Sequence, residues 1–343
     1  MPQNSPEYLQ TSTAAAMTMK LLPGRFFRGA RLNALNLLLT YEDGCKANCS
    51  YCGLSKARDV DEEDRTFIRV DWPSYQIDEI IKRTNEHGKH LQRLCVSMIT
   101  HPRAFEDMCW VMKKFKDETD LLISGLISPT MIKDKKSIER IRISGADMVG
   151  IAIDTVTPEL FEEHRGKGVK GPHKWDHYWE VVKWCVEVFG RGNVGVHLIV
   201  GLGETEREMI ESIQRAEDLG AKTHLFSFFP EGGSKLEKHV QPSYGRYRRV
   251  QLARYIINGG LGSLNNMKFN EKGQVIEFGV DLNKIIQDGE AFMTSGCAGK
   301  NGKVACNRPF GNERPSRPIR NFPFLPDEQD IKLIKEQLAD YSL

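Results

Sequence analysis

Three cysteines in one short segment are the strongest chemical feature of the sequence. Cys45, Cys49 and Cys52 fall within eight residues, spaced Cys-x3-Cys-x2-Cys. Thiolates favour soft metal centres such as zinc or iron–sulfur clusters. A structural zinc site needs four ligands, whereas three thiolates can hold three irons of a [4Fe–4S] cluster and leave the fourth iron open to a reactant. The alternatives are a zinc loop completed by a distant residue and three unrelated buried thiols.

The elements that must position these cysteines follow a regular order. Apolar runs alternate with helix-like stretches, which predicts a parallel sheet with helical crossovers. The expected strands are Asn33–Thr40, Leu91–Met98, Leu121–Leu126, Asp147–Ile153, Val194–Val200 and His224–Phe229. The expected helices are Ser74–His87, Phe105–Glu118, Ser128–Ile143, Trp175–Phe189, Glu204–Leu219 and Tyr244–Asn258. Six such units favour an α/β fold with a partial barrel, and the cysteine segment follows its first strand, where α/β folds place their chemistry.

Length and composition set the remaining bounds. The 343 residues divide into an N-terminal extension (1–30), a partial barrel (31–262) and an irregular C-terminal extension (263–343) that ends in a helix. A balance of 48 Lys and Arg against 46 Asp and Glu gives no reason to expect nucleic-acid binding. We expect no membrane segment and no secretory signal, and therefore a cytoplasmic protein with reduced cysteines.

The cysteine motif, with Tyr51 just before its last Cys, resembles the signature of the radical S-adenosylmethionine (radical SAM) superfamily. The resemblance implies that Cys45, Cys49 and Cys52 hold a [4Fe–4S] cluster whose open iron binds SAM. It implies that one electron from the cluster splits SAM into methionine and a 5′-deoxyadenosyl radical. The partial (β/α)6 barrel of that superfamily agrees with the six units expected here.

Two strand ends supply expected SAM contacts. Ile199-Val-Gly201-Leu-Gly203-Glu204 resembles the superfamily element that lies along the adenine. By itself, this turn shows two glycines that allow close backbone approach and a carboxylate suited to a helix start.

Asp154 ends the fourth expected strand, where it could bond a ribose hydroxyl, while Thr157 and Pro158 read as the cap and first residue of the next helix. Arg165 could meet the SAM carboxylate or form an exposed ion pair. After the second strand, Ser97 begins a segment that departs from the Gly-Gly-Glu of many radical SAM enzymes, so the contact to the SAM amino group stays open between Ser97 and backbone carbonyls.

Further elements resemble the biotin-synthase branch, including Pro230 to Leu236 and Gly145 to Asp147. Biotin synthase carries a sulfur-donating cluster on its barrel strands. Cys95 occupies one of those positions, whereas Leu121 and Gly195 stand near two others.

The tail adds Cys297 and Cys306, flanked by glycines that permit a tight backbone. We expect the tail to fold over the barrel mouth and bring both cysteines to Cys95, forming an auxiliary [4Fe–4S] cluster. The alternative is two ordinary thiols and a buried Cys95; Cys109 and Cys185 read as core residues on helices.

The tail segments from Cys306 and from Arg320, together with the barrel, look like one component of the two-protein lipoyl synthase, with the C8-acting component favoured. That resemblance implies a sulfurtransferase that inserts sulfur into a protein-bound octanoyl chain. The implied partners are an octanoylated lipoyl-carrier protein (H protein or E2 domain), the other synthase component and a one-electron donor such as ferredoxin. Arg308, Arg314 and Arg320 could face an acidic carrier.

Two rival functions remain. One is another biotin-synthase-like radical SAM enzyme that acts on a small molecule, such as a cofactor maturase or methylase. The other is a non-enzymatic iron–sulfur or zinc protein. No catalytic residue is assigned; among His173, His177 and His197, the last is the best placed, because it faces inward near the end of the fifth expected strand.

Overall fold

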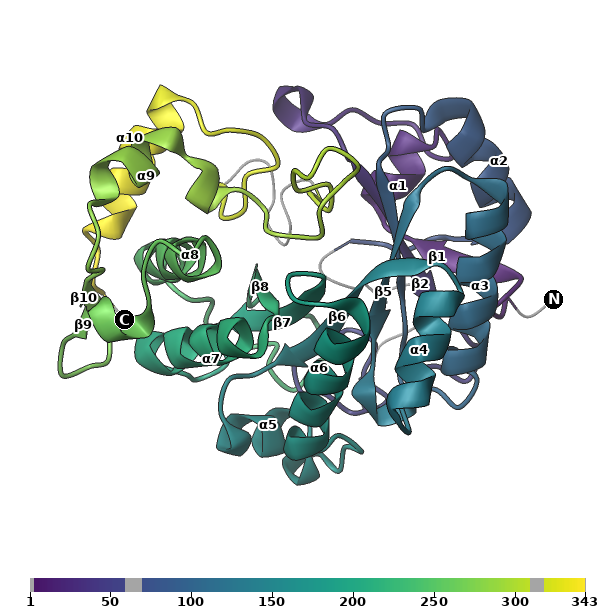
Figure 1. The fold of residues 1–343 in the computed structure, drawn as a ribbon, viewed down its shortest axis with the longest axis horizontal. Helices are drawn as coiled ribbons and strands as arrows, with labels where there is room; N and C mark the ends of the chain where they lie inside the picture. The colour runs from purple at the N-terminus through teal and green to yellow at the C-terminus, as the bar shows by residue number, and fades with distance from the viewer. Residues whose placement is uncertain (1–2, 59–69, 309–317, 343) are drawn as a thin grey trace.

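A computed structural model describes residues 3–58, 70–308 and 318–342, and its centre is an eight-stranded sheet in the order β3-β1-β2-β4-β5-β6-β7-β8 (Figure 1). Six neighbouring strands of this sheet run parallel. They are β2 (Ala34–Leu39), β4 (Arg93–Ser97), β5 (Leu122–Ile127), β6 (Ala146–Asp154), β7 (Val194–Val200) and β8 (Lys222–Ser227). The prediction of six parallel strands in a partial barrel is confirmed.

Helices cross between the strands and cover the outer face of the sheet (Figure 1). They are α2 (Ile77–His87), α3 (Ala104–Glu118), α4 (Lys135–Ile143), α5 (Pro158–His164), α6 (Trp175–Phe189), α7 (Glu206–Leu219) and α8 (Tyr244–Asn258). The helix expected over Ser128–Ile143 begins only at Lys135, because the side chain of Asp134 caps it by accepting from the Ser137 N–H. Thr157 caps α5 and Pro158 is its first residue, as predicted.

Two short antiparallel strands, one of them from the N-terminal segment, extend the edge of the sheet. β1 (Tyr8–Thr11) pairs with β2 on one side and with β3 (Ser74–Gln76) on the other. The helix predicted from Ser74 therefore starts with three extended residues and becomes helical at Ile77.

The C-terminal extension packs along α8. It contains β9 (Lys268–Phe269), β10 (Val275–Glu277), α9 (Leu282–Asp288) and α10 (Glu328–Leu338). These elements lie with α8 at one end of the molecule (Figure 1). Phe292, Phe322 and Ile334 of this extension belong to the same apolar core as the barrel. The extension therefore has no separate core.

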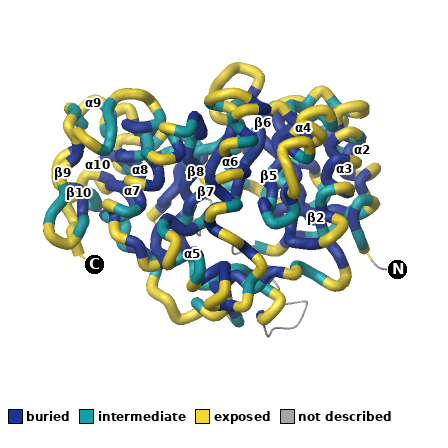
Figure 2. The backbone as a smooth tube through the Cα atoms, turned by 60° about the horizontal axis from the view of Figure 1, so that its bottom comes forward, coloured by how far each residue is buried: buried dark blue, intermediate teal, exposed yellow. Residues whose placement is uncertain are grey.

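Alternation along the strands separates an outer from an inner face. In β7, Val196, Leu198 and Val200 are fully buried, whereas His197 and Ile199 between them are partly exposed. The buried set faces the helices, and the partly exposed set lines the interior of the barrel, which we call the lumen. Figure 2 shows the same division, with buried strands inside a more exposed layer of helices and loops. Among the described residues, no helix is long and apolar enough to cross a membrane.

Candidate active site

The loop that follows β2, here called the cysteine loop (residues 44–58), gathers the three motif thiols. The Ala47 N–H donates to Cys45 Sγ at 3.5 Å, and the Leu54 N–H donates to Cys52 Sγ at 3.4 Å. Burial raises the pKa of Cys52 well above its ordinary value, and the charges of Cys49 and Cys45 raise it further. The three sulfurs thus lie close enough to interact, and a bound metal centre would offset the repulsion between their thiolates.

The cysteine loop is held in place by segments that follow four other strands. The His164 ring, after β6, joins the cysteine loop to the loop after β7: Nδ1 pairs with Ser50 Oγ and Nε2 with the Leu202 carbonyl, both at 2.9 Å. Arg58 donates from Nε to the Gly232 carbonyl at 2.6 Å, after β8. The Lys46 N–H donates to the Thr100 carbonyl at 2.7 Å, after β4. The motif therefore sits where the carboxyl ends of the parallel strands converge, as predicted.

Three of the predicted SAM-binding residues form one buried cluster beside Cys49. Tyr51 donates its hydroxyl to Asp154 Oδ2 at 2.6 Å, and Arg165 pairs with the same oxygen at 3.4 Å. Asp154 has a positive φ of 66°, an unfavourable conformation for a non-glycine residue that is common at functional sites. Arg165 also donates to the Ile153 carbonyl at 2.7 Å and is 5% exposed. It is therefore part of a buried network and not the exposed ion pair considered from the sequence.

The turn after β7 has a shape that glycine makes possible. Gly201 and Gly203 have φ angles of 108° and 114°, which side-chain-bearing residues rarely adopt. The Glu204 carboxylate accepts from the N–H groups of Gly201 at 2.7 Å and Leu202 at 2.8 Å, and it pairs with Arg246 at 2.6 Å. The helix begins two residues later and is capped by Thr205, so the expectation that Glu204 serves the helix start is wrong. The charged carboxylate of Glu204 instead stabilises the turn by accepting from its two N–H groups.

Ser97 ends β4 on the same face of the strand as Cys95; Ile199 is the last but one residue of β7, and Gly201 follows the strand. Ser97, Asp154 and Ile199 thus reach the same end of the lumen from three parallel strands. Their contacts with SAM remain predictions.

The thiols do not surround a position for a single metal ion. Among residues 3–58, 70–308 and 318–342, no three Cys, His, Asp or Glu side chains converge on one metal-ion position. A [4Fe–4S] cluster does not require such convergence, because each thiolate binds a different iron.

The protein combines a partial barrel with a loop of three thiols at the carboxyl ends of its strands. This combination is typical of iron–sulfur enzymes whose cluster keeps one iron open to a reactant. The radical SAM superfamily model matches residues 40–216, slightly more than half of the chain, and the protein belongs to this superfamily. No curated protein matches the sequence.

Solved structures share the fold at low sequence identity. HydG from Carboxydothermus hydrogenoformans, an FeFe-hydrogenase maturase, aligns with 16% identity and a TM-score of 0.51, over 72% of this chain and 56% of that one. A second HydG structure gives 16% identity and a TM-score of 0.51, over 66% of this chain and 49% of that one. Methylornithine synthase (PylB) gives 17% identity and a TM-score of 0.49, over 70% and 67% of the two chains. The chain spans about half the length of the HydG structures.

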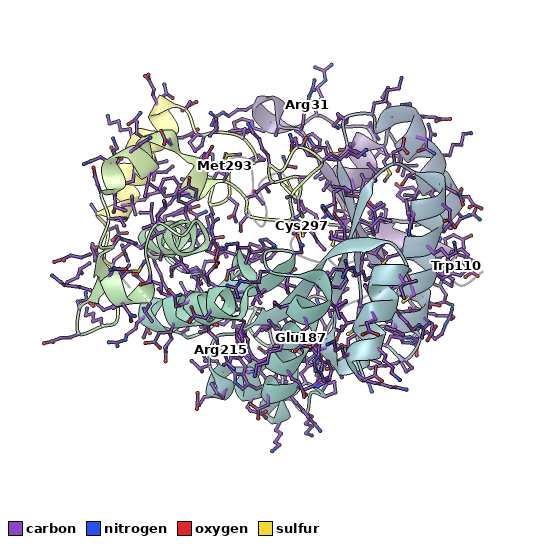
Figure 3. The ribbon with its side chains drawn as sticks, in the orientation of Figure 1. Arg31, Trp110, Glu187, Arg215, Met293 and Cys297 are labelled. Atoms are coloured by element: carbon purple, nitrogen blue, oxygen red, sulfur yellow. The ribbon has the colours of Figure 1, made fainter. Side chains whose placement is uncertain are left out.

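A second group of thiols lies at the other end of the lumen. This group consists of Cys95 on β4 and of Cys297 and Cys306 in the tail. Burial raises the pKa of Cys95 and of Cys297 far above the ordinary value of a thiol. The charge of Cys306 raises both pKa values further, so the three thiols interact electrostatically. The Cys306 N–H donates to the Cys297 carbonyl at 3.2 Å, and Asn36 Nδ2 lies 3.9 Å from Cys306 Sγ. Figure 3 labels Cys297 on the tail loop beside the strands.

Close backbone packing holds this tail loop together, as its glycines suggested. A Cβ on Gly296 would lie 2.4 Å from the Cys306 carbonyl oxygen, and a Cβ on Gly299 would lie 2.0 Å from Gln92 Oε1. Arg93, 1% exposed, joins the loop to the barrel. It donates from Nε to the Ala298 carbonyl at 2.6 Å and pairs with both oxygens of Asp147 at 2.5 and 2.7 Å.

The tail covers the barrel at the amino ends of the strands and not at the mouth, where it was expected. The Asn33 N–H donates to Asn307 Oδ1 at 2.8 Å, and Arg93 is the first residue of β4, so the tail loop contacts the amino ends of the strands. The prediction that it folds over the mouth at the carboxyl ends is wrong, although the three cysteines do come together.

Of the three tail arginines, the two that the structure describes are engaged within the protein. Arg320 is 4% exposed and donates to the Pro242 carbonyl at 2.8 Å. Arg308 is buried between Cys306 and Glu231, and burial lowers its pKa to about 10. Arg314 lies outside the described residues.

Two of the histidines considered from the sequence have structural partners. The His173 Nδ1 pairs with Thr130 Oγ1 at 2.6 Å and with the Tyr178 hydroxyl at 2.8 Å, and His177 Nε2 pairs with the Pro129 carbonyl at 2.9 Å. Cys109 and Cys185 are buried in the apolar core, as predicted. Sequence reasoning gave no role to Arg93, Asn36 or Ser50, since each acts through a partner distant in the sequence.

Proposed function

We propose that the protein is a sulfur-inserting radical SAM enzyme, one component of a bipartite lipoyl synthase that acts on a protein-bound octanoyl chain. The observation that carries this proposal is two separate sets of three cysteines along one lumen. Cys45, Cys49 and Cys52 lie at the carboxyl ends of the strands. Cys95 lies midway along β4, and Cys297 and Cys306 lie on the tail loop that contacts the amino ends.

The lining of the lumen supports an acyl substrate. Leu126, Ala152, Ile199 and Phe226 are partly exposed and follow the inward-facing strand positions. Partly exposed apolar side chains on the inner face of the partial barrel favour an aliphatic chain, because burying each methylene contributes about 0.8 kcal/mol. They also exclude water from the reaction centre, where it could quench a radical intermediate.

Each group of residues has a distinct task in this proposal. When bound, a [4Fe–4S] cluster with SAM supplies a 5′-deoxyadenosyl radical after one-electron reduction, and a second cluster supplies the sulfur. Cys45, Cys49 and Cys52 would hold the first cluster, and the buried cluster of Tyr51, Asp154 and Arg165 lies beside it. Cys95, Cys297 and Cys306 would hold the second cluster.

Arg93 contributes to the second site in two ways. Its positive charge lies near Cys95 and Cys297, where it favours their thiolate forms. Its hydrogen bond to the Ala298 carbonyl fixes the loop that carries Cys297. The expected partners are an octanoylated H protein or E2 domain, the second synthase component and a ferredoxin-like donor of single electrons.

The substrate class is tested with a peptide that carries perdeuterated octanoyl-lysine. The reconstituted protein receives SAM, reductant and this peptide, alone and with a candidate partner component. We expect deuterium in the 5′-deoxyadenosine and a peptide mass that corresponds to the replacement of one C–D bond by a C–S bond. Formation of 5′-deoxyadenosine without deuterium under all conditions would reject the octanoyl substrate and favour a radical SAM reaction on a small molecule.

A further inference from the structure

Two histidines on neighbouring strands face the lumen and have no task in the chemistry described above. His197 of β7 and His224 of β8 are register partners in the parallel pair. Their ring centroids are 5.4 Å apart, with an interplanar angle of 77°. Both follow the inward-facing alternation of their strands, so they present two imidazoles to the same region of the lumen.

Glycines on the preceding strands make room for both rings. A Cβ on Gly150 would lie 3.1 Å from His197 Nε2, and a Cβ on Gly195 would lie 2.5 Å from His224 Nε2. Each imidazole therefore lies over a glycine, and the second contact is too short for any other residue at position 195 unless the ring moves. The two rings occupy a cradle that depends on these glycines.

The His224 ring has unused hydrogen-bonding capacity. His224 is 6% exposed, and neither Nδ1 nor Nε2 has a hydrogen-bond partner among the described residues. Buried polar atoms in proteins are nearly always paired, since an unpaired one costs about 1–3 kcal/mol. Two unpaired nitrogens on one buried ring, aimed into the lumen, indicate a group that joins them during function.

Both imidazoles are uncharged at neutral pH. Burial lowers the pKa of His197 to about 4, against the opposing charge of Asp154. Burial lowers the pKa of His224 well below its ordinary value, and the charges of His197 and Arg254 lower it further. Each neutral imidazole offers one N–H donor and one lone pair. The complementary ligand is an uncharged group with both a donor and an acceptor.

The surroundings restrict this ligand further. The Phe226 ring lies 5.2 Å from that of His197, so the site is apolar on one side. Arg254, the nearest cation named above, donates to the Ala291 carbonyl at 3.0 Å. A secondary amide attached to an aliphatic chain offers a donor and an acceptor to the two imidazoles and an apolar part to the wall, whereas a carboxylate offers acceptors only and would leave an imidazole lone pair without a donor.

We propose that His197 and His224 bind the amide that joins the acyl chain to its carrier lysine and so set the position of the chain in the lumen. This inference rests on the proposed function, because it names how the same lumen recognises its substrate. It predicts selectivity for an amide-linked acyl group over an otherwise identical ester.

The test measures binding without turnover. Reconstituted protein with SAM and without reductant is titrated by calorimetry with an octanoyl-lysine peptide and with its ester analogue, octanoylated on 6-hydroxynorleucine. We expect the amide to bind about tenfold more tightly than the ester, which is the effect of one well-placed hydrogen bond. His224→Phe and His197→Phe should each reduce this ratio towards one, and His224→Gln, which keeps a donor and an acceptor, should retain most of it.

Phe226→Leu is the matched control, because it removes a neighbouring ring without removing a hydrogen-bonding group, and it should weaken both ligands equally. Equal binding of amide and ester by the unmodified protein, or an unchanged ratio in the His→Phe variants, would overturn the inference. Absence of binding of either peptide would overturn the proposed octanoyl substrate as well. Histidine-dependent amide selectivity without sulfur insertion would support the inference and reject the proposed reaction.

Discussion

Cys49→Ala is expected to reduce formation of 5′-deoxyadenosine by about 10³-fold or more, because residues that act as one unit fail together. Cys49 is the middle thiol of the motif and is 8% exposed, so alanine fills its place with little strain. The loss follows from the chemistry of the site: with one of three thiolates removed, the cluster is no longer held with a single open iron. The measurement is iron content after anaerobic reconstitution, together with 5′-deoxyadenosine formed from SAM and dithionite.

Cys185→Ala is the matched control for this variant. Cys185 is a fully buried thiol of α6 within the apolar core, and its replacement should cost about 1–2 kcal/mol of the free energy of unfolding while leaving iron and SAM cleavage intact. If Cys49→Ala kept SAM cleavage at the unmodified rate, the assignment of the cysteine loop as the SAM cluster site would be wrong.

Replacing Cys297 and Cys306 together with alanine is expected to separate the two halves of the reaction. The double variant should lose about four irons per chain and sulfur insertion should fall about 100-fold or more, whereas SAM cleavage should stay within about threefold. The reason is spatial: both cysteines lie on the tail loop that contacts the amino ends of the strands, and the cysteine loop lies at the carboxyl ends. The measurement is iron content, reductive SAM cleavage and product mass on the same preparation.

Cys109→Ala serves as the control here, since Cys109 is a buried helix residue in the apolar core. Unchanged iron content in the double variant would remove the second cluster from the account. The protein would then remain a radical SAM enzyme without an internal sulfur source, as the rival small-molecule reaction requires.

The repeating part of the structure was predictable from the sequence. The strand alternation of Val194–Val200 and the helix Tyr244–Asn258 appear with the expected bounds, because hydrophobic periodicity reports burial directly. The cysteine loop was predictable because three ligands are adjacent in the chain. Tyr51, Asp154 and Arg165 were selected separately, and the fold brings them into one cluster.

What was missed depends on contacts between segments distant in the sequence. The tail has no hydrophobic period, so nothing in it showed that Asn307 would bond Asn33 and place the loop at the amino ends of the strands. Glu204 precedes a helix, but the two N–H groups of its own turn bind its charge first. His224 stood at the start of a predicted strand, and its unpaired ring became visible only once Gly195 of the preceding strand lay beside it.

The central claim is that the thiols of the tail hold the sulfur that the enzyme inserts. It is tested most directly by reconstituting the protein with iron and ³⁴S-labelled sulfide, removing free sulfide, and running a single turnover with SAM, reductant and octanoyl-lysine peptide in unlabelled buffer. The account predicts that the inserted sulfur is ³⁴S in the unmodified protein and that no labelled product forms in the Cys297→Ala/Cys306→Ala variant. A product that carries unlabelled sulfur, or labelled product from the double variant, would contradict it.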